Sequence, residues 1–162
     1  MSATDELLRN NEEFAAHPPA PLEASPAKHV AVVACMDSRM DTSAVLGLRP
    51  GEANVIRNAG GVITDDVIRS LAISQQQLGT REIVLIHHTD CALLDLADDA
   101  FKQRVEAESG SRPDWPVEGF RDLAVDVHWS IFRVRTSTFL AHRDAVRGFI
   151  YDVTTGRLTE VT

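Results

Sequence analysis

The chain has 162 residues, of which 44% are hydrophobic and 25% are charged. These values are typical of a globular protein, and the length suits one domain with its own core. The formal net charge is −8, and the sequence contains no long cluster of Lys and Arg. Because phosphate groups are bound by basic side chains, this balance argues against nucleic acid and acidic membrane surfaces as partners.

The N-terminal segment lacks the features of a leader sequence. It begins MSATDELLRNNEEF, with no basic stretch followed by an apolar one, so no signal peptide is predicted. No apolar run reaches membrane-spanning length. We therefore expect a cytoplasmic protein, in which thiols stay reduced. In that compartment the two cysteines, Cys35 and Cys91, favour a metal or catalytic site over a disulfide.

The first predicted element is a short helix on an arm. Residues 4–16 have an apolar and a polar side, and the Pro-rich segment HPPAPLEASP follows them. A helix on such a linker is poorly placed to pack on its own domain. We therefore interpret residues 1–26 as a helical arm and linker that reaches a partner subunit, within a single domain of residues 1–162.

After the arm, apolar strands alternate with helices. Strands are expected at residues 29–35, 53–57 and 82–88, and helices at residues 41–47, 64–78, 93–107 and 120–134. The final segments GFIYDV and LTEV predict a β-hairpin that turns around Gly156. This alternation predicts an α/β fold with a central parallel sheet of four to five strands, flanked by helices on both faces.

Side chains that bind metals follow two of the predicted strands. Cys35 ends the first strand in ACMDSRM, and Asp37 and Arg39 alternate with it, so the three side chains share one face of an extended chain. His88 ends the third strand in HHTDC, and Cys91 follows at a spacing that lets both reach one ion. Sites in open α/β sheets form at the carboxyl ends of strands, so the two motifs are expected to meet.

The combined residues predict a zinc site. Two thiolates and one imidazole suit zinc, and three protein ligands leave a fourth tetrahedral position. That position can hold water, whose pKa falls to about 7 on zinc, or the carboxylate of Asp37. An ion pair between Asp37 and Arg39 would hold the carboxylate off the metal. Taken alone, the cysteines would instead be interpreted as small buried hydrophobic residues.

The pairing of C-x-D-x-R with H-x-x-C resembles the β-class carbonic anhydrases, most closely the short bacterial group of actinobacterial type, which is related to carbonyl sulfide hydrolases. The resemblance spans nearly the whole chain, through VACMDSRMD, GEANVIRNAGG, TDDVIRSLAIS, LGTREIVLIHHTDC and RGFIYDVTTG. It implies the β-carbonic anhydrase fold and one Zn²⁺ per subunit, held by Cys35, His88 and Cys91. Some members close the site by using the residue equivalent to Asp37 as a fourth ligand.

The resemblance also implies an activity and an assembly. The expected enzyme is a carbonate dehydratase, a zinc lyase that reversibly hydrates CO2 to bicarbonate and a proton. Zinc-bound hydroxide would attack CO2 while Asp37, paired with Arg39, orients it. The family further implies a homodimer, with the sheet continued across the interface and the N-terminal helix on the neighbouring subunit. A tetramer stays open.

Three small residues are expected to bind substrate. Gly60 and Gly61 of the NAGG segment allow close backbone approach to a small ligand, and the family places this loop at the pocket. Ala92 stands where the family usually has Gly after the second cysteine. Its methyl group would narrow the pocket, or strain the backbone if φ were positive.

Three alternative functions stay open. One is a carbonyl sulfide hydrolase that uses the same zinc site, with a pocket reshaped near Ala92. Another is a zinc-binding relative whose activity has lapsed, and a third is a redox pair of Cys35 and Cys91. Among other residues, His87 is expected to face away from His88 and to act in packing. Trp115 and Trp129 are expected to lie in the core or at an interface.

Overall fold

A five-stranded sheet with the order β2-β1-β3-β4-β5 forms the centre of the protein, in a computed structural model that describes residues 2–162. The strands are β1 Val30–Cys35, β2 Ala53–Asn58, β3 Glu82–His88, β4 Val146–Tyr151 and β5 Leu158–Val161. The first four run parallel, and β5 is antiparallel to β4. The predicted α/β fold, its parallel sheet and its C-terminal hairpin are confirmed.

Helices precede and connect the parallel strands. Within residues 2–162 they are α1 Ala3–Ala15, α2 Thr42–Leu46, α3 Asp65–Leu78, α4 Asp98–Ser109 and α5 Leu123–Thr136, with the 3-10 helix η1 at Ala59–Gly61. The side chains of Asp41, Thr64 and Asp122 accept hydrogen bonds from the first turns of α2, α3 and α5. Gly47 and Gly79 end α2 and α3 in the left-handed conformation. These capping residues fix the helix boundaries.

The start of α4 differs from the prediction. The helix was expected to begin at Leu93, but it begins at Asp98. Leu94 instead forms a bridge with Phe120, and the N–H of Asp95 donates to the Phe120 carbonyl at 2.7 Å. Asp95 also adopts a φ of 58°, which a right-handed helix does not allow. Pairing with a distant segment therefore overrides the local helical pattern.

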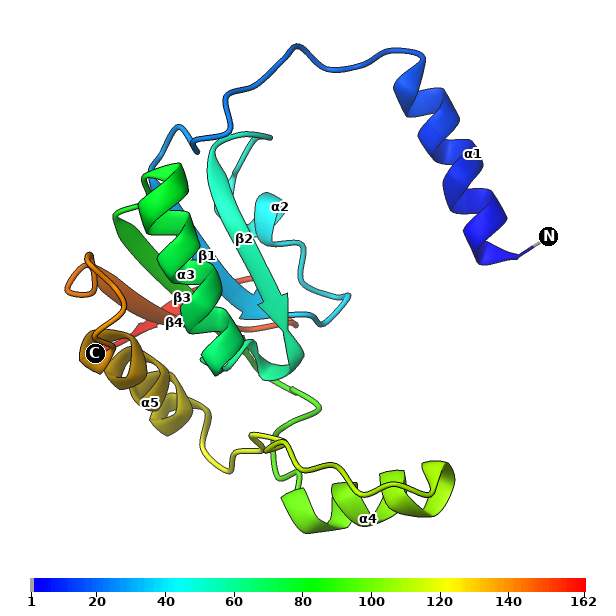
Figure 1. The fold of residues 1–162 in the computed structure, drawn as a ribbon, viewed down its shortest axis with the longest axis vertical. Coiled ribbons are helices and arrows are strands. Elements are labelled where there is room, and N and C mark those ends of the chain that lie inside the picture. Colours follow the sequence, from blue (N-terminus) through cyan, green and yellow to red (C-terminus); the bar gives the residue numbers. More distant parts are fainter. Residues whose placement is uncertain (1) are drawn as a thin grey trace.

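The sheet separates two hydrophobic clusters. Helices α3 and α5 cover one face (Figure 1), in a cluster that contains Val33, Leu71, Leu85 and Val127. Helix α2 and the segments around residues 93 and 120 cover the other face, in a cluster that contains Val32, Ala34, Ile86 and Tyr151. Helices therefore lie on both faces, as predicted, although non-helical segments cover much of the second face.

The predicted N-terminal helix is present as α1, which lies apart from the sheet at the end of its linker (Figure 1). A capping box between Ser2 and Asp5 stabilises its first turn. None of its described residues is buried. The same is true of α4. None of the described helices has the length and apolar character needed to cross a bilayer.

The prediction that Trp115 and Trp129 lie in the core is wrong. Trp115 is exposed and its ring lies 6.3 Å from that of Phe101. Trp129 is exposed on α5, where it packs edge-on against Phe132 at 5.6 Å. An interface role for either residue stays a prediction. Each ring covers a neighbouring aromatic side chain at the surface instead of filling the interior.

Candidate metal centre

Cys35, His88 and Cys91 come together at the carboxyl edge of the sheet. Cys35 ends β1, His88 ends the neighbouring parallel strand β3, and Cys91 lies in the turn that follows. All three side chains are buried, and their ligand atoms lie within 4.8 Å of one another. Across residues 2–162, this is the one group of three or more His, Cys, Asp or Glu side chains arranged to hold a metal ion.

The hydrogen bonding of His88 leaves one ring nitrogen available to a metal. Nδ1 lies 2.8 Å from the backbone carbonyl of Thr89, which can only accept, so Nδ1 carries the proton and donates. Nε2 is buried and has no hydrogen-bond partner. A lone pair on Nε2, with Nδ1 tied to a carbonyl, is the form in which histidine binds metals. Together with two sulfur atoms, this orphaned nitrogen fits the donor set of zinc.

The three side chains of this cluster alter one another's protonation. A hydrogen bond with Cys91, followed by one with His88, lowers the pKa of the Cys35 thiol despite its burial. The same contact, with burial added, raises the pKa of Cys91. Interaction with the Cys35 sulfur raises the pKa of His88, although Nε2 makes no hydrogen bond of ordinary geometry. A low thiol pKa favours metal binding, because a thiol must lose its proton to become a ligand.

Asp37 lies beside this cluster and is held by Arg39. Its Oδ1 accepts from the backbone N–H of Arg39 at 2.9 Å and from Nε at 3.0 Å, while Oδ2 accepts from Nη2 at 2.7 Å. These hydrogen bonds hold the pKa of the Asp37 carboxyl well below its usual range. Oδ2 lies 3.8 Å from Nε2 of His88. The ion pair expected from the sequence is therefore present, next to the ligand atoms.

Arg57 anchors the backbone of the first motif and was not identified from the sequence. It lies on β2, and its Nε and Nη2 donate to the carbonyl of Cys35 at 2.9 and 2.7 Å. Nη2 also donates to the carbonyl of Asp37 at 2.7 Å. Strand pairing places Arg57 opposite Ala34, one residue before Cys35. A correct register for the first two strands was the signal that could have revealed this contact.

The glycines of NAGG let η1 pack against the strands that carry Cys35 and His88. Gly60 and Gly61 have φ values of 79° and 72°, which favour glycine. A Cβ atom on Gly61 would lie 2.8 Å from the backbone nitrogen of Cys35 and 3.0 Å from the carbonyl oxygen of Ile86. Ala92 is exposed and does not adopt positive φ, so the backbone strain considered for it is absent.

His87 is directed to the opposite side of β3 from His88. It is fully buried, with Nδ1 3.0 Å from Oδ2 of Asp126 and Nε2 3.5 Å from Oγ of Ser130. Both partners belong to α5. His87 therefore links β3 to α5, in agreement with the packing role predicted for it.

The chain is similar to known proteins along its whole length. The carbonic anhydrase family model matches residues 30–115. Beta-carbonic anhydrase 1 of Mycobacterium tuberculosis is 52% identical over 162 residues, covering 100% of this chain and 99% of the relative. The chain belongs to the β-carbonic anhydrase family. The family predicted from the paired motifs is confirmed, and with it the classification as an enzyme, a carbonate dehydratase.

Two further comparisons extend the assignment. The crystal structure of carbonic anhydrase from Streptococcus mutans has a TM-score of 0.94 at 40% identity, covering 100% of this chain and 99% of that chain. A carbon disulfide hydrolase of Acidithiobacillus thiooxidans is 31% identical over 147 residues, covering 78% of this chain and 74% of that protein. The relatives of this chain therefore include a protein that is named for a substrate other than CO2.

Proposed function

We propose that this enzyme reversibly hydrates CO2 to bicarbonate and a proton, with one Zn²⁺ per subunit held by Cys35, His88 and Cys91. The observation that carries the proposal is the buried cluster of their ligand atoms, within 4.8 Å of one another and beside the Asp37–Arg39 pair. Membership of the β-carbonic anhydrase family supports the reaction. When bound, zinc supplies the Lewis acidity that makes a nucleophile from water near neutral pH.

Asp37 is the proposed orienting group, with Arg39 as its catalytic partner. Because the guanidinium of Arg39 lowers the pKa of Asp37, the carboxyl is ionised at neutral pH and only accepts hydrogen bonds. A carboxylate at this position would accept a hydrogen bond from the attacking water or hydroxide. The oxygen lone pair of that group would then be directed at the carbon of CO2. Arg39 binds both carboxylate oxygens, which supports an open state in which Asp37 stays off the metal.

Gly60, Gly61 and Ala92 are the proposed border of the substrate site. Gly60 is buried, and a Cβ atom there would lie 2.7 Å from Cδ2 of Leu93 and 3.2 Å from Cγ1 of Val62. Apolar side chains therefore pack closely around this loop, which suits a small apolar substrate such as CO2.

The test of this mechanism is stopped-flow CO2 hydration by zinc-loaded protein and by Asp37→Ala. Loss of an outer-shell partner typically costs about 10–100-fold in activity, and we expect at least that loss for Asp37→Ala. Zinc content is measured on both proteins, so that lost turnover is separated from lost metal. Full activity of Asp37→Ala would reject the orienting role.

Hydrolysis of carbonyl sulfide or carbon disulfide at the same site is the second candidate. Similarity to a carbon disulfide hydrolase favours it, since these substrates are linear like CO2. The test compares CO2, carbonyl sulfide and carbon disulfide on one preparation. A strong preference for CO2 would reject this candidate. Stoichiometric zinc with no turnover of any of the three would identify a lapsed relative.

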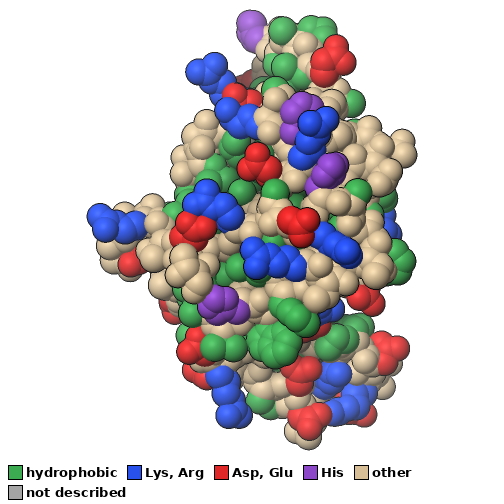
Figure 2. Space-filling model, turned by 90° about the vertical axis from the view of Figure 1, so that its left-hand side faces the viewer, with side chains coloured by type: hydrophobic (Ala, Val, Ile, Leu, Met, Phe, Trp, Pro, Cys, Tyr) green, Lys and Arg blue, Asp and Glu red, His purple; other side chains and the backbone are tan. Residues whose placement is uncertain are grey.

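A homodimer is the proposed assembly, with a tetramer as the larger alternative. β2 is an edge strand and can pair with a second copy. On α1 the hydrophobic side chains Leu7, Leu8 and Phe14 are exposed, and Figure 2 shows further hydrophobic side chains at the surface among charged ones. Such apolar surface favours burial against a partner subunit.

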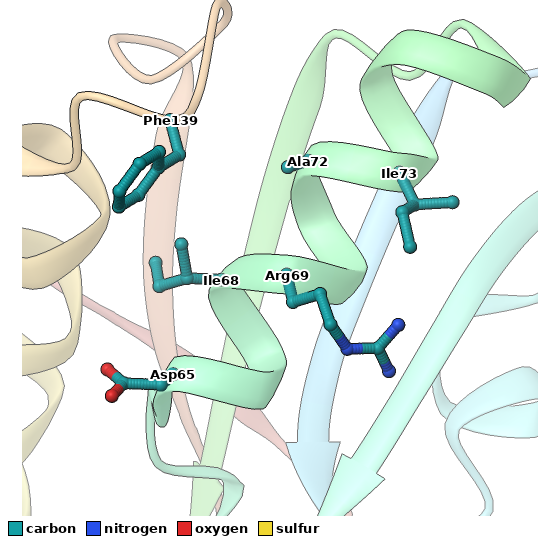
Figure 3. Close-up of a pocket in the computed structure, with 6 residues that line it drawn as sticks. All are labelled: Asp65, Ile68, Arg69, Ala72, Ile73 and Phe139. Atoms are coloured by element: carbon teal, nitrogen blue, oxygen red, sulfur yellow. The ribbon is translucent and has the colours of Figure 1, made fainter.

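A pocket of about 540 Å³ between α3 and the segment after α5 offers a place for such contact. It is lined by Asp65, Ile68, Arg69, Ala72, Ile73 and Phe139, and Figure 3 shows Ile68 and Phe139 on the same side of α3. None of the proposed site residues lines it. Sedimentation velocity of the full chain and of a variant without residues 1–26 tests the assembly: a monomeric full chain would reject it. We also propose a cytoplasmic location, where the two free cysteines would stay reduced.

A further inference from the structure

Arg39 is shared between two carboxylates, and the proposed function uses only one of them. Nε and Nη2 hold Asp37. Nη1 donates to Oδ2 of Asp90 at 2.6 Å, and Nη2 donates to the backbone carbonyl of Asp90 at 2.9 Å. Asp90 directly precedes Cys91 in the chain. One guanidinium therefore connects the two loops that carry the proposed ligands.

Asp90 adopts a backbone conformation that favours glycine. Its φ is 55°, in the left-handed region where most side chains are strained and where Asp and Asn are tolerated best. The side chain is 77% exposed, and exposed ion pairs add little stability. Glycine would relieve the strain at this position, so stability alone does not explain an aspartate here. From this conformation, both the carboxylate and the backbone carbonyl of Asp90 contact Arg39.

The turn that carries Asp90 is fixed from its other side. The N–H of Thr89 donates to the carbonyl of Tyr151 at 2.9 Å, and Oγ1 of Thr89 accepts from the N–H of Val153 at 3.1 Å. The end of β4 thus holds the turn in place. Asp90 is therefore a fixed anchor for the flexible guanidinium of Arg39.

We infer that Asp90 is a positioning residue, which fixes Arg39, and through it the carboxylate of Asp37, relative to the ligand Cys91. Without the Asp90 carboxylate, Arg39 keeps its bonds to Asp37, but the pair is tied less firmly to the second ligand loop. Asp37 then shifts relative to His88, from which its Oδ2 now lies 3.8 Å. Both expected effects rest on the proposed metal site, and the effect on turnover rests in addition on the proposed reaction.

Three variants test this inference. Asp90→Gly removes the carboxylate and relieves the left-handed backbone. Asp90→Asn keeps an oxygen that can accept from Arg39 and tolerates the same φ, so it is the conservative rescue. Asp95→Gly is the matched control, because Asp95 is also an exposed aspartate, has a similar φ of 58° and is not one of the residues that hold Arg39. Each protein is prepared with zinc and, separately, with cobalt(II), whose visible spectrum reports the geometry of its ligands.

For Asp90→Gly we expect kcat for CO2 hydration to fall about tenfold, as for other outer-shell partners, with KM changed less than about twofold. Zinc content stays at one per subunit and the cobalt spectrum shifts. Asp90→Asn recovers most of kcat, and Asp95→Gly matches the wild type in every measurement. Because the cobalt spectrum needs no substrate, it tests the positioning role even if the wild type does not hydrate CO2, an outcome that would reject only the proposed reaction.

Two results would overturn the inference. One is an Asp90→Gly protein with the kcat and the cobalt spectrum of the wild type. The other is loss of zinc, or a fall in Tm beyond that of Asp95→Gly, because either would show that Asp90 serves to form the turn and not to position Arg39.

Discussion

Replacing Gly61 with Ala is expected to lower the stability of the protein, because Gly61 packs against the ends of β1 and β3. Gly61 has a φ of 72°, and a left-handed backbone costs a non-glycine residue about 1–2 kcal/mol. The added Cβ would also lie 2.8 Å from the backbone nitrogen of Cys35 and 3.0 Å from the carbonyl oxygen of Ile86. Backbone atoms cannot move aside as a flexible side chain can, and crowding a packed interior costs about 1–3 kcal/mol.

The two costs together predict that the free energy of unfolding falls by about 2–5 kcal/mol. For a chain of this size each kcal/mol lowers Tm by about 2–4 °C, so Gly61→Ala should unfold roughly 4–20 °C below the wild type. Zinc affinity should fall with it, because the clash separates the strands that hold Cys35 and His88. Thermal unfolding and competition with a zinc chelator measure the two effects.

Gly110→Ala is the matched control. Gly110 ends α4 with a φ of 77°, and nothing lies within 4 Å of its added Cβ, so this variant bears only the backbone cost. Its zinc affinity should equal that of the wild type. Equal falls in Tm for the two variants would refute the argument from the close contact at Gly61.

Three further predictions follow from the same contacts. The folded pKa of Asp37 lies below its ordinary value, so its pairing with Arg39 stabilises the protein above the usual carboxyl pKa of about 3.9 and is lost as the pH falls toward the folded value. Urea unfolding between about pH 2 and 7 should therefore show a weaker acid dependence for Arg39→Gln than for the wild type. Arg57→Lys cannot keep all three hydrogen bonds to the backbone carbonyls, including that of Cys35, so zinc affinity should fall about tenfold in chelator competition. His87→Ala leaves a cavity between β3 and α5, so the free energy of unfolding in urea should fall by about 2–5 kcal/mol. A fall of less than about 1 kcal/mol would contradict the packing role.

Local patterns in the sequence were sufficient to predict the cluster of Cys35, His88 and Cys91, which could hold a metal ion, and much of the fold. Cys35 and His88 could be placed at strand ends because apolar runs precede them and parallel strands end at one edge of a sheet. Thr64 and Gly79 fixed the limits of α3, because capping is a property of single residues near the helix ends. Each of these features is encoded within a few residues.

Contacts between distant segments could not be predicted in the same way. Arg57 reaches the first motif only because β2 pairs with β1 in one register. Asp90 meets Arg39 only because its own φ is positive, which nothing in HHTDC requires. The predicted start of α4 was wrong because Leu94 pairs with Phe120. Register and backbone torsion at such positions depend on tertiary packing, which a single sequence does not display.

The most direct test of the central claim is a zinc titration of protein from which metal has been removed by dialysis against a chelator, followed by stopped-flow CO2 hydration. We expect activity to rise linearly to one equivalent of zinc per subunit and then to stay constant, while Cys91→Ser shows no such rise. Full activity without added zinc, or activity of Cys91→Ser equal to that of the wild type, would contradict the assignment of the Cys35, His88 and Cys91 cluster as the site of reaction.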